Sequence, residues 1–160
     1  MPSDRRALLC AYLQARTTLT LATCSSGRPW ASSLFYACDR ECRLYFVSDT
    51  RTLHSRDIAE NPQVAVTVSG QALDWLDIEG VQLVATASLL EGAQRMRAEQ
   101  CYLERFPKLA AMRDRPADTQ ERSTADRLLG SGLYCLTPSW ARVIDNRQGF
   151  GHKLEIAFDR

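Results

Sequence analysis

The part of the sequence that most constrains the fold is Leu44-Tyr45-Phe46-Val47-Ser48-Asp49-Thr50-Arg51-Thr52-Leu53-His54, which closes at Asn61-Pro62. Its aromatic and β-branched first half predicts a strand. Its second half predicts the start of a short helix, with Asp49 or Thr50 as the N-cap and Pro62 as the stop. A helix start presents free N–H groups and a positive dipole end, so it favours an anion. The segment therefore predicts a site for a phosphate-bearing cofactor.

Four polar side chains lie around this predicted helix start, namely Ser48, Arg51, Thr52 and His54. Hydroxyl and imidazole groups can donate hydrogen bonds to phosphate oxygens, and a guanidinium adds a fixed positive charge. These residue types therefore predict phosphate contacts. For His54, an ordinary surface histidine on the helix is the alternative interpretation.

The rest of the chain reads as short strands with helical insertions. We expect helices at 4–15, 51–60 and 92–106, and strands at 19–24, about 30–38, about 42–48, 64–68, 77–90, 132–145 and 152–158. Residues 25–29 predict a turn, and the polar stretch 118–127, which follows Pro107 and Pro116, predicts a solvated loop or a frayed helix. Alternating short strands with tight turns favour an antiparallel barrel. The predicted fold class is mainly β with α insertions (α+β), in a single domain over 1–160.

The composition excludes several classes of protein. The chain has 160 residues, 45% of them hydrophobic and 24% charged, with a formal net charge of +1. This balance is that of a globular domain and gives no footprint for nucleic-acid binding. No apolar run approaches the ~20 residues that span a bilayer, and the start of the chain does not resemble a secretory signal. We therefore expect a cytoplasmic protein with no membrane or nucleic-acid partner.

The six cysteines show neither a Cys-x-x-Cys pair nor zinc-type spacing with the two histidines. Cys38 and Cys42 flank a predicted turn and could face each other across a hairpin. In a cytoplasmic protein, reduced and partly buried thiols are the simpler interpretation. We predict no metal site.

At this point a resemblance becomes specific. The order of motifs is similar to that of the pyridoxamine 5′-phosphate oxidase-like superfamily of FMN-binding split β-barrels. The residues that carry it are Gly27-Arg28-Pro29, Ala31-Ser32-Ser33-Leu34-Phe35-Tyr36, Phe46-Val47-Ser48, Thr52-Leu53-His54, Asn61-Pro62 and Glu79-Gly80-Val81-Gln82. The ending, residues 145–153, resembles a small bacterial branch of that superfamily. The similarity covers nearly the whole chain apart from the polar segment after Pro107.

The resemblance implies a homodimer with two FMN sites at the subunit interface. It implies that the second strand runs along the flavin, so that Ser32 and Ser33 face the polar tail while Leu34 and Phe35 lie near the ring. It also places Val47 and Ser48, on the next long strand, among the cofactor contacts. The alternative is an ordinary barrel strand whose serines bind solvent.

The phosphate end departs from the better-known enzymes of this superfamily. Where they have Ser-Arg-Lys, this chain has Thr52-Leu53-His54. The threonine keeps a hydroxyl, the leucine removes a fixed cation, and the histidine is a titratable substitute. Arg51 is close enough in sequence to supply the missing charge. Two expectations follow: FMN binds more weakly than is usual in the family, or the site prefers another ligand.

Three further residues are candidate cofactor contacts. The resemblance places a glutamine like Gln82 against the flavin of the neighbouring subunit, and a solvent-facing glutamine on a strand is the equal alternative. Between the last two strands, Phe150 could cover a ring and Lys153 could meet its charge. A glycine-containing hairpin turn with Phe150 packed on the core is the alternative there.

No nucleophile–base pair or carboxylate pair identifies a catalytic residue, and no substrate is recognisable. Flavin chemistry belongs largely to the cofactor, so this does not exclude an enzyme. The sequence leaves two hypotheses. One is an FMN-dependent oxidoreductase that acts on an unidentified small molecule. The other is a non-catalytic flavin- or haem-binding or sensing protein on the same fold.

Overall fold

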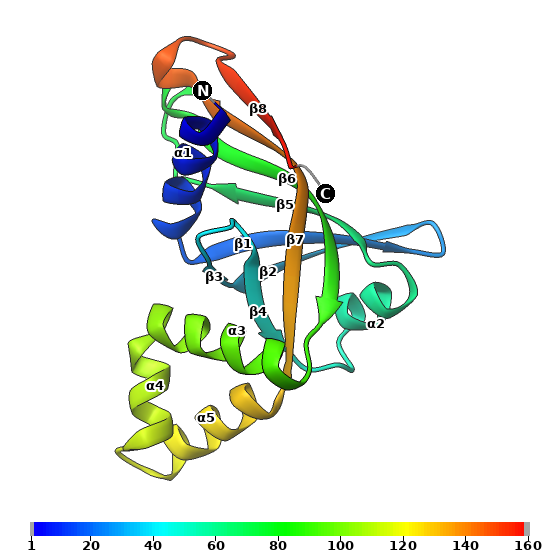
Figure 1. Ribbon diagram of the computed structural model, residues 1–160, viewed down its shortest axis with the longest axis vertical. Helices are drawn as coiled ribbons and strands as arrows, with labels where there is room; N and C mark the ends of the chain where they lie inside the picture. Colours follow the sequence, from blue (N-terminus) through cyan, green and yellow to red (C-terminus); the bar gives the residue numbers. More distant parts are fainter. Residues whose placement is uncertain (1, 159–160) are drawn as a thin grey trace.

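A single antiparallel sheet organises the computed structural model, which describes residues 2–158 (Figure 1). Its spatial order is β2-β1-β5-β6-β7-β4-β3, and β8 also pairs with β7. The strands are β1 (Thr18–Ser25), β2 (Arg28–Phe35), β3 (Ala37–Cys38), β4 (Leu44–Ser48), β5 (Gln63–Ser69), β6 (Glu79–Leu89), β7 (Gly132–Asp145) and β8 (Lys153–Ala157). The curled sheet confirms the predicted antiparallel split barrel.

Alternation of apolar and polar residues decides which face of each strand is buried. In β5 the valines at 64, 66 and 68 are buried and their neighbours are exposed. β6 repeats the pattern, and its register with β5 and β7 is antiparallel throughout, with an irregularity between Val84 and Ala85. Such irregularities bend strands, so the sheet curls around the side chains of its inner face. The main core lies on that face.

Strand β7 is the spine of the molecule, as the long orange strand in Figure 1 shows. Its 14 residues pair with β6 along most of their length. On its other edge β4 pairs with residues 132–136 and β8 with residues 140–144. One strand therefore joins two different ends of the barrel.

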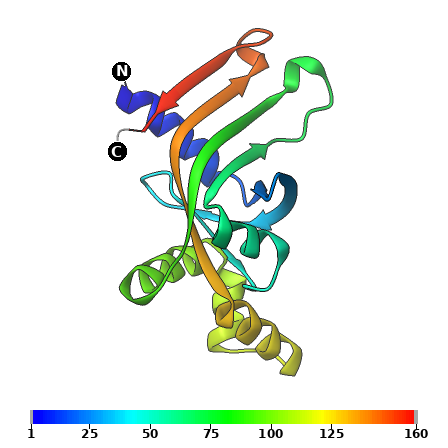
Figure 2. The same cartoon turned by 90° about the vertical axis from the view of Figure 1, so that its right-hand side faces the viewer.

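The helices gather in three places (Figures 1 and 2). They are α1 (Pro2–Gln14), α2 (Leu53–Glu60), α3 (Gly92–Arg105), α4 (Pro107–Asp114) and α5 (Thr119–Gly130), with short 3₁₀ turns η1 (Trp75–Asp77) and η2 (Asn146–Gln148). Helix α1 packs near β3 and β8, and α2 near β1 and β2. Helices α3, α4 and α5 form a group at the end where β7 begins, around a second cluster of buried side chains.

The structure decides between two predicted alternatives and corrects one strand. Of the loop and the helix predicted for 118–127, the structure has the helix: residues 119–127 belong to α5, whose N-cap Asp118 accepts a hydrogen bond from the amide of Glu121 at 2.8 Å. The expected strand at 30–38 is interrupted at Tyr36, which is fully buried and donates its hydroxyl to the carbonyl of Leu13 at 2.6 Å. The Tyr36 amide also donates to the carbonyl of Thr17 at 2.9 Å, so the interruption coincides with long-range contacts that the local pattern does not encode.

The six cysteines are all free thiols. Cys38 lies on β3 and Cys42 in the following loop, where its φ of 62° is left-handed. No helix in the described part of the chain is both long and apolar enough to cross a membrane. Within residues 2–158, no group of three histidine, cysteine, aspartate or glutamate side chains is arranged to hold a metal ion.

Candidate functional site

Helix α2 begins at Leu53, four residues after Asp49, and its N-cap is Thr52. The backbone of Thr52 is extended (φ −65°, ψ 157°), and its hydroxyl accepts from the amide of Ser55 at 3.4 Å. The prediction of Asp49 or Thr50 as the cap was therefore wrong. The Asp49 carboxylate instead accepts from the amide of Arg51 at 2.9 Å, so it stabilises the turn before the helix.

Four polar side chains meet beside this helix start, and we name Ser32, Ser48, Thr52 and His54 the hydroxyl–imidazole cluster. Nδ1 of His54 lies 3.1 Å from the Ser32 hydroxyl of β2. Its Nε2 lies 2.7 Å from the Ser48 hydroxyl of β4 and 3.1 Å from the Thr52 hydroxyl. The imidazole ring thus connects side chains from β2, from β4 and from the start of α2.

The hydrogen-bond roles in this cluster are partly fixed. The indole Nε1 of Trp30 can only donate, and it lies 3.0 Å from the Ser32 hydroxyl, so Ser32 accepts there. The Thr52 hydroxyl lies 2.9 Å from the Asp49 carbonyl, to which it donates. The serine hydroxyls can donate to the His54 ring or accept from it, and therefore both tautomers of a neutral imidazole fit the cluster.

Burial around the imidazole of His54 favours its neutral form. Its side chain lies among buried residues, with 7% of the residue surface exposed, and the edge of Phe46 approaches with ring centroids 6.2 Å apart. Burial lowers the pKa of His54, and the nearby charge of Asp57 opposes this effect. Asp57 is itself buried and accepts a hydrogen bond of 2.6 Å from Thr23.

Arg51 does not join the cluster in a single chain. Its side chain is 88% exposed and forms an ion pair with Asp49 at 2.6 Å. Both residues, with Thr50, line a polar cleft of about 790 Å³ whose other wall is α5. The side of the turn that carries Arg51 therefore faces this cleft.

Strand β2 presents its predicted contact residues on two faces. Ser32 and Leu34 are partly buried, whereas Ser33 and Phe35 are exposed. The ring of Phe35 is 61% exposed and meets Phe106 edge-on at 5.8 Å. Because β2 is the edge strand of the sheet, one side of its backbone has no partner strand within this chain. Val47 of β4 is partly buried.

The remaining candidates lie away from the cluster. Gln82 is exposed on β6, and Arg142 donates to its side-chain oxygen at 3.5 Å. Phe150 is 75% exposed in the β7–β8 hairpin, and Lys153 is exposed at the start of β8. The hairpin prediction is confirmed, but Phe150 is not packed on the core. The 14 residues of β7 span roughly 40 Å and separate this hairpin from the end where β7 pairs with β4.

Sequence reasoning missed three residues of the site: Thr23, Trp30 and Asp57. Two of them had a readable signal. Trp30 stands two residues before Ser32, so both side chains share one face of a strand, and Asp57 stands three residues after His54 on one face of a helix. Thr23 carried no such signal, because its contact depends on how β1 packs against α2.

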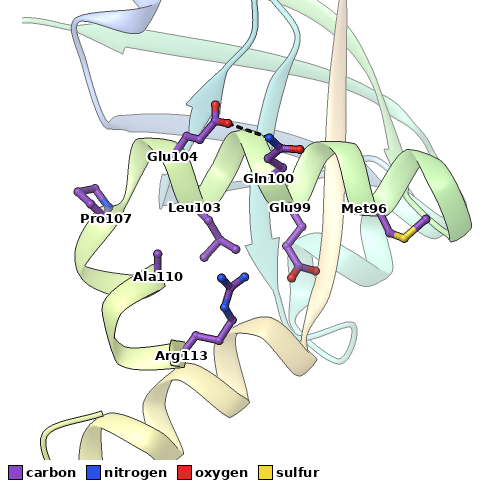
Figure 3. Close-up of a pocket in the computed structure, with 8 residues that line it drawn as sticks. All are labelled: Met96, Glu99, Gln100, Leu103, Glu104, Pro107, Ala110 and Arg113. Carbon is purple, nitrogen blue, oxygen red and sulfur yellow. Dashed lines mark hydrogen bonds between the residues drawn. The ribbon is translucent and has the colours of Figure 1, made fainter. Parts of the chain in front are cut away.

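A groove of about 500 Å³ lies elsewhere, between α3 and α4 (Figure 3). Its lining comprises Met96, Glu99, Gln100, Leu103, Glu104, Pro107, Ala110 and Arg113. It contains no member of the hydroxyl–imidazole cluster, so it is a separate feature of the helical end.

Comparison with known proteins now adds a family. Residues 8–129 match the family model described as pyridoxamine 5′-phosphate oxidase. A UPF0306 protein of Yersinia pseudotuberculosis is 30% identical over 148 residues, which is 92% of this chain and 89% of the relative.

Two solved structures share the fold at low sequence identity. A haem-binding protein from Mycobacterium smegmatis has a TM-score of 0.69 and 20% identity, over 95% of this chain and 57% of that one. The haem storage protein HutZ from Vibrio cholerae has a TM-score of 0.58 and 23% identity, over 82% and 88% of the two chains.

Proposed function

The chain belongs to the pyridoxamine 5′-phosphate oxidase family, and on that premise we propose that it binds FMN with the flavin phosphate at the hydroxyl–imidazole cluster. The observation that carries this proposal is the convergence of Ser32, Ser48 and Thr52 on the two ring nitrogens of His54. Strand β2, which leads away from the cluster, would then run beside the rest of the cofactor.

The residues present fit a phosphate group chemically. The hydroxyls of Ser32 and Ser48 and the imidazole can donate hydrogen bonds to it, whereas the Thr52 hydroxyl donates to the Asp49 carbonyl. Helix α2 starts at Leu53, and its first two amides, those of Leu53 and His54, have no partner within the helix, so they suit an anion. The nearest buried carboxylate, that of Asp57, is already occupied by the Thr23 hydroxyl. The side chains that form the cluster are therefore donors.

We further propose that the protein is an oxidoreductase. When bound, FMN supplies hydride or single-electron transfer, and the protein supplies binding, orientation and electrostatics. In this chain Ser32, Ser48, Thr52 and His54 hold the phosphate, and Leu34 and the exposed ring of Phe35 lie along the strand that follows. The acceptor or donor is a small molecule of unassigned identity.

The same proposal includes a homodimer with shared sites. Strand β2 pairs with β1 on one side only, at the edge of the sheet, and it carries exposed aromatic side chains at Trp30 (48%) and Phe35 (61%). Exposed apolar side chains of this size favour burial against another surface. Gln82, Phe150 and Lys153 have no hydrogen bond to the cluster among the described contacts, and in this proposal they reach the site of a second copy.

The test is an absorption spectrum of gently purified protein, followed by titration of the colourless fraction with FMN and with riboflavin. We expect flavin bands or micromolar uptake of FMN. The variant His54→Ala should lose FMN affinity by about 1–3 kcal/mol and lose less affinity for riboflavin, because riboflavin lacks the phosphate. The matched control is His152→Ala, since His152 is the only other histidine and is exposed. Absence of FMN binding at every concentration tested would refute the proposal.

Haem binding is the second candidate, because two proteins of the same fold are described as binding or storing haem. In this chain the exposed His152 lies beside the exposed Phe150, and an imidazole with a neighbouring ring suits a planar iron porphyrin. Titration with haemin separates the candidates. A Soret band that depends on His152 and not on His54 would favour haem, and flavin uptake that depends on His54 would favour FMN.

A further inference from the structure

The ring of His54 lies beside the start of α2, and its described hydrogen bonds are all to neutral groups. The described hydrogen-bond partners of its ring are the hydroxyls of Ser32, Ser48 and Thr52. A phosphate monoester near neutral pH is largely a dianion, because its second pKa is about 6. A neutral imidazole offers that charge one N–H donor and no compensating positive charge.

We propose that this chain binds the FMN phosphate together with a proton on His54, so that the flavin site fills near pH 6 and empties as the pH rises. This inference rests on the proposed function and adds a mode of regulation to the same site. It makes cofactor occupancy, and not only chemistry, sensitive to pH.

The geometry of the cluster shows how one proton would act. A neutral ring donates from one nitrogen and accepts at the other, so one serine hydroxyl is used up in donating to the ring. An imidazolium donates from both nitrogens, to Ser32 at 3.1 Å and to Ser48 at 2.7 Å. Both hydroxyl hydrogens are then available to an outside acceptor. Protonation therefore frees one further hydroxyl hydrogen for an acceptor outside the cluster.

Trp30 strengthens this effect at Ser32. Its indole N–H donates to the Ser32 oxygen at 3.0 Å. When His54 also donates, both lone pairs of that oxygen are used, and the hydroxyl hydrogen must find an acceptor elsewhere. A phosphate oxygen meets that demand. The cluster is thus matched to an anionic acceptor in its protonated state.

The described charged groups near His54 place no uncompensated positive charge beside the ring, so they do not oppose its protonation. On α2, the carboxylate of Asp57 favours the protonated ring, while burial disfavours it. Beyond the helix start, Asp49 and Arg51 neutralise each other as an exposed ion pair. Strands β2 and β4 contribute the neutral hydroxyls described above. A bound phosphate would therefore add the negative charge that favours a protonated His54 ring.

The experiment measures the dissociation constants of FMN and riboflavin from pH 6 to pH 9, with calorimetry in two buffers of different ionisation enthalpy. We expect the FMN constant to rise by up to tenfold per pH unit above pH 7, with uptake of close to one proton. Riboflavin binding should be insensitive to pH. The variant His54→Lys carries a cation throughout this range, so its FMN affinity should change little with pH, and the control His152→Gln should behave as the natural chain.

The outcomes separate this inference from the function on which it rests. FMN binding with no pH dependence and no proton uptake would overturn the inference and leave the proposed function standing. Failure to bind FMN at any pH would overturn both. If His54→Lys does not fold, NMR titration of the natural protein decides the question, because His152→Gln identifies the two imidazole signals. The pKa of His54 should rise when FMN is added, and an unchanged pKa would refute the inference.

Discussion

The two candidate sites lie near the two ends of strand β7, and they differ in how many candidate side chains contact one another there. At one end, Ser48 of β4 pairs with Gly132, and four polar side chains from three segments meet at His54. At the other end, the β7–β8 hairpin leaves Phe150 and Lys153 exposed. The first end brings its candidate residues together within a single chain, whereas at the second end Phe150 and Lys153 stay exposed although the neighbouring Asn146 bonds to Trp75.

This difference separates two kinds of sequence signal. The hairpin was identified from a local motif, two glycines around an aromatic, and that motif specifies a turn: Gly149 and Gly151 have φ values of 129° and 79°. The cluster was predicted from one strand and a helix start, with Arg51 among its members, and the family resemblance implied that Ser32 of a second strand faces the same cofactor. A local motif determines the backbone conformation of one turn, whereas a site built from several elements depends on how those elements pack together.

The largest expected contrast compares a phenylalanine from each end. Phe46 is fully buried, stacks on Tyr134 with centroids 4.9 Å apart and supports His54. Phe46→Ala should lower the free energy of unfolding by about 3–5 kcal/mol, while Phe150→Ala should change it by no more than about 0.5 kcal/mol. Urea unfolding measures both. A large loss in Phe150→Ala would break the comparison by showing that Phe150 is buried in the assembled protein.

A second contrast compares one polar pair from each end. Thr23 donates to Asp57 at 2.6 Å behind the cluster, and both residues are buried. Thr23→Val leaves that carboxylate without its donor and should cost about 1–3 kcal/mol. On β7 and β8, Arg142 and Glu155 form an ion pair with side chains 33% and 47% exposed, so Glu155→Gln should cost about 1 kcal/mol or less. Equal losses in urea unfolding would contradict the assignment of the Thr23 pair to the interior.

The third contrast uses the two histidines. Because burial lowers the pKa of His54 below 6.5, the unfolded chain binds more protons than the folded chain as the pH falls through 6.5 towards the folded pKa. This contribution to stability is complete above pH 6.5 and is lost below it, at no more than about 1.4 kcal/mol per pH unit.

Unfolding midpoints of the flavin-free protein from pH 5 to pH 8 measure this effect. His54→Gln should remove the part due to His54, whereas His152→Gln at the exposed hairpin should leave the profile as it is. If His152→Gln and not His54→Gln changed the pH dependence of the unfolding midpoint, the hairpin histidine would be the buried one and the comparison would be reversed.

How much the sequence predicts can be judged at particular residues. The strands were predictable because alternation in segments such as residues 63–69 reports burial directly, and the resemblance to the family ordered them into a split barrel. Helix α5 was less clear because its sequence is polar and charged, and its one buried residue, Ala125, belongs to a cluster that also includes side chains of the strands and of the other helices.

The site was predictable where chain order implies contact, and not elsewhere. Ser48, Thr52 and His54 follow one another at a strand–helix junction, so their meeting could be expected. The ion pair that draws Arg51 to Asp49 could not, because two residues of opposite charge in one turn satisfy each other before either reaches a neighbouring group. The contacts of Thr23 with Asp57 depend on tertiary packing between β1 and α2.

The smallest contrast lies within that junction, between two threonines two positions apart. Thr52 caps α2: its oxygen accepts from the Ser55 amide, and its hydroxyl lies 2.9 Å from the Asp49 carbonyl. Thr50, which the sequence also offered as a cap, is exposed. Thr52→Ala should therefore lower the free energy of unfolding by about 1 kcal/mol, and Thr50→Ala should leave it nearly unchanged.

The reason this small difference matters is geometric. With Thr52 as the cap, His54 is the second residue of the helix, and its ring turns back to reach Ser48 at 2.7 Å. If the helix began at Thr50, His54 would stand one half-turn later on another face, and the cluster would not form. Amide hydrogen exchange of the flavin-free protein tests the point, since Thr52→Ala should speed exchange at Ser55 and Thr50→Ala should not. Faster exchange in Thr50→Ala would place the start of the helix at the earlier threonine and separate His54 from its hydroxyl partners.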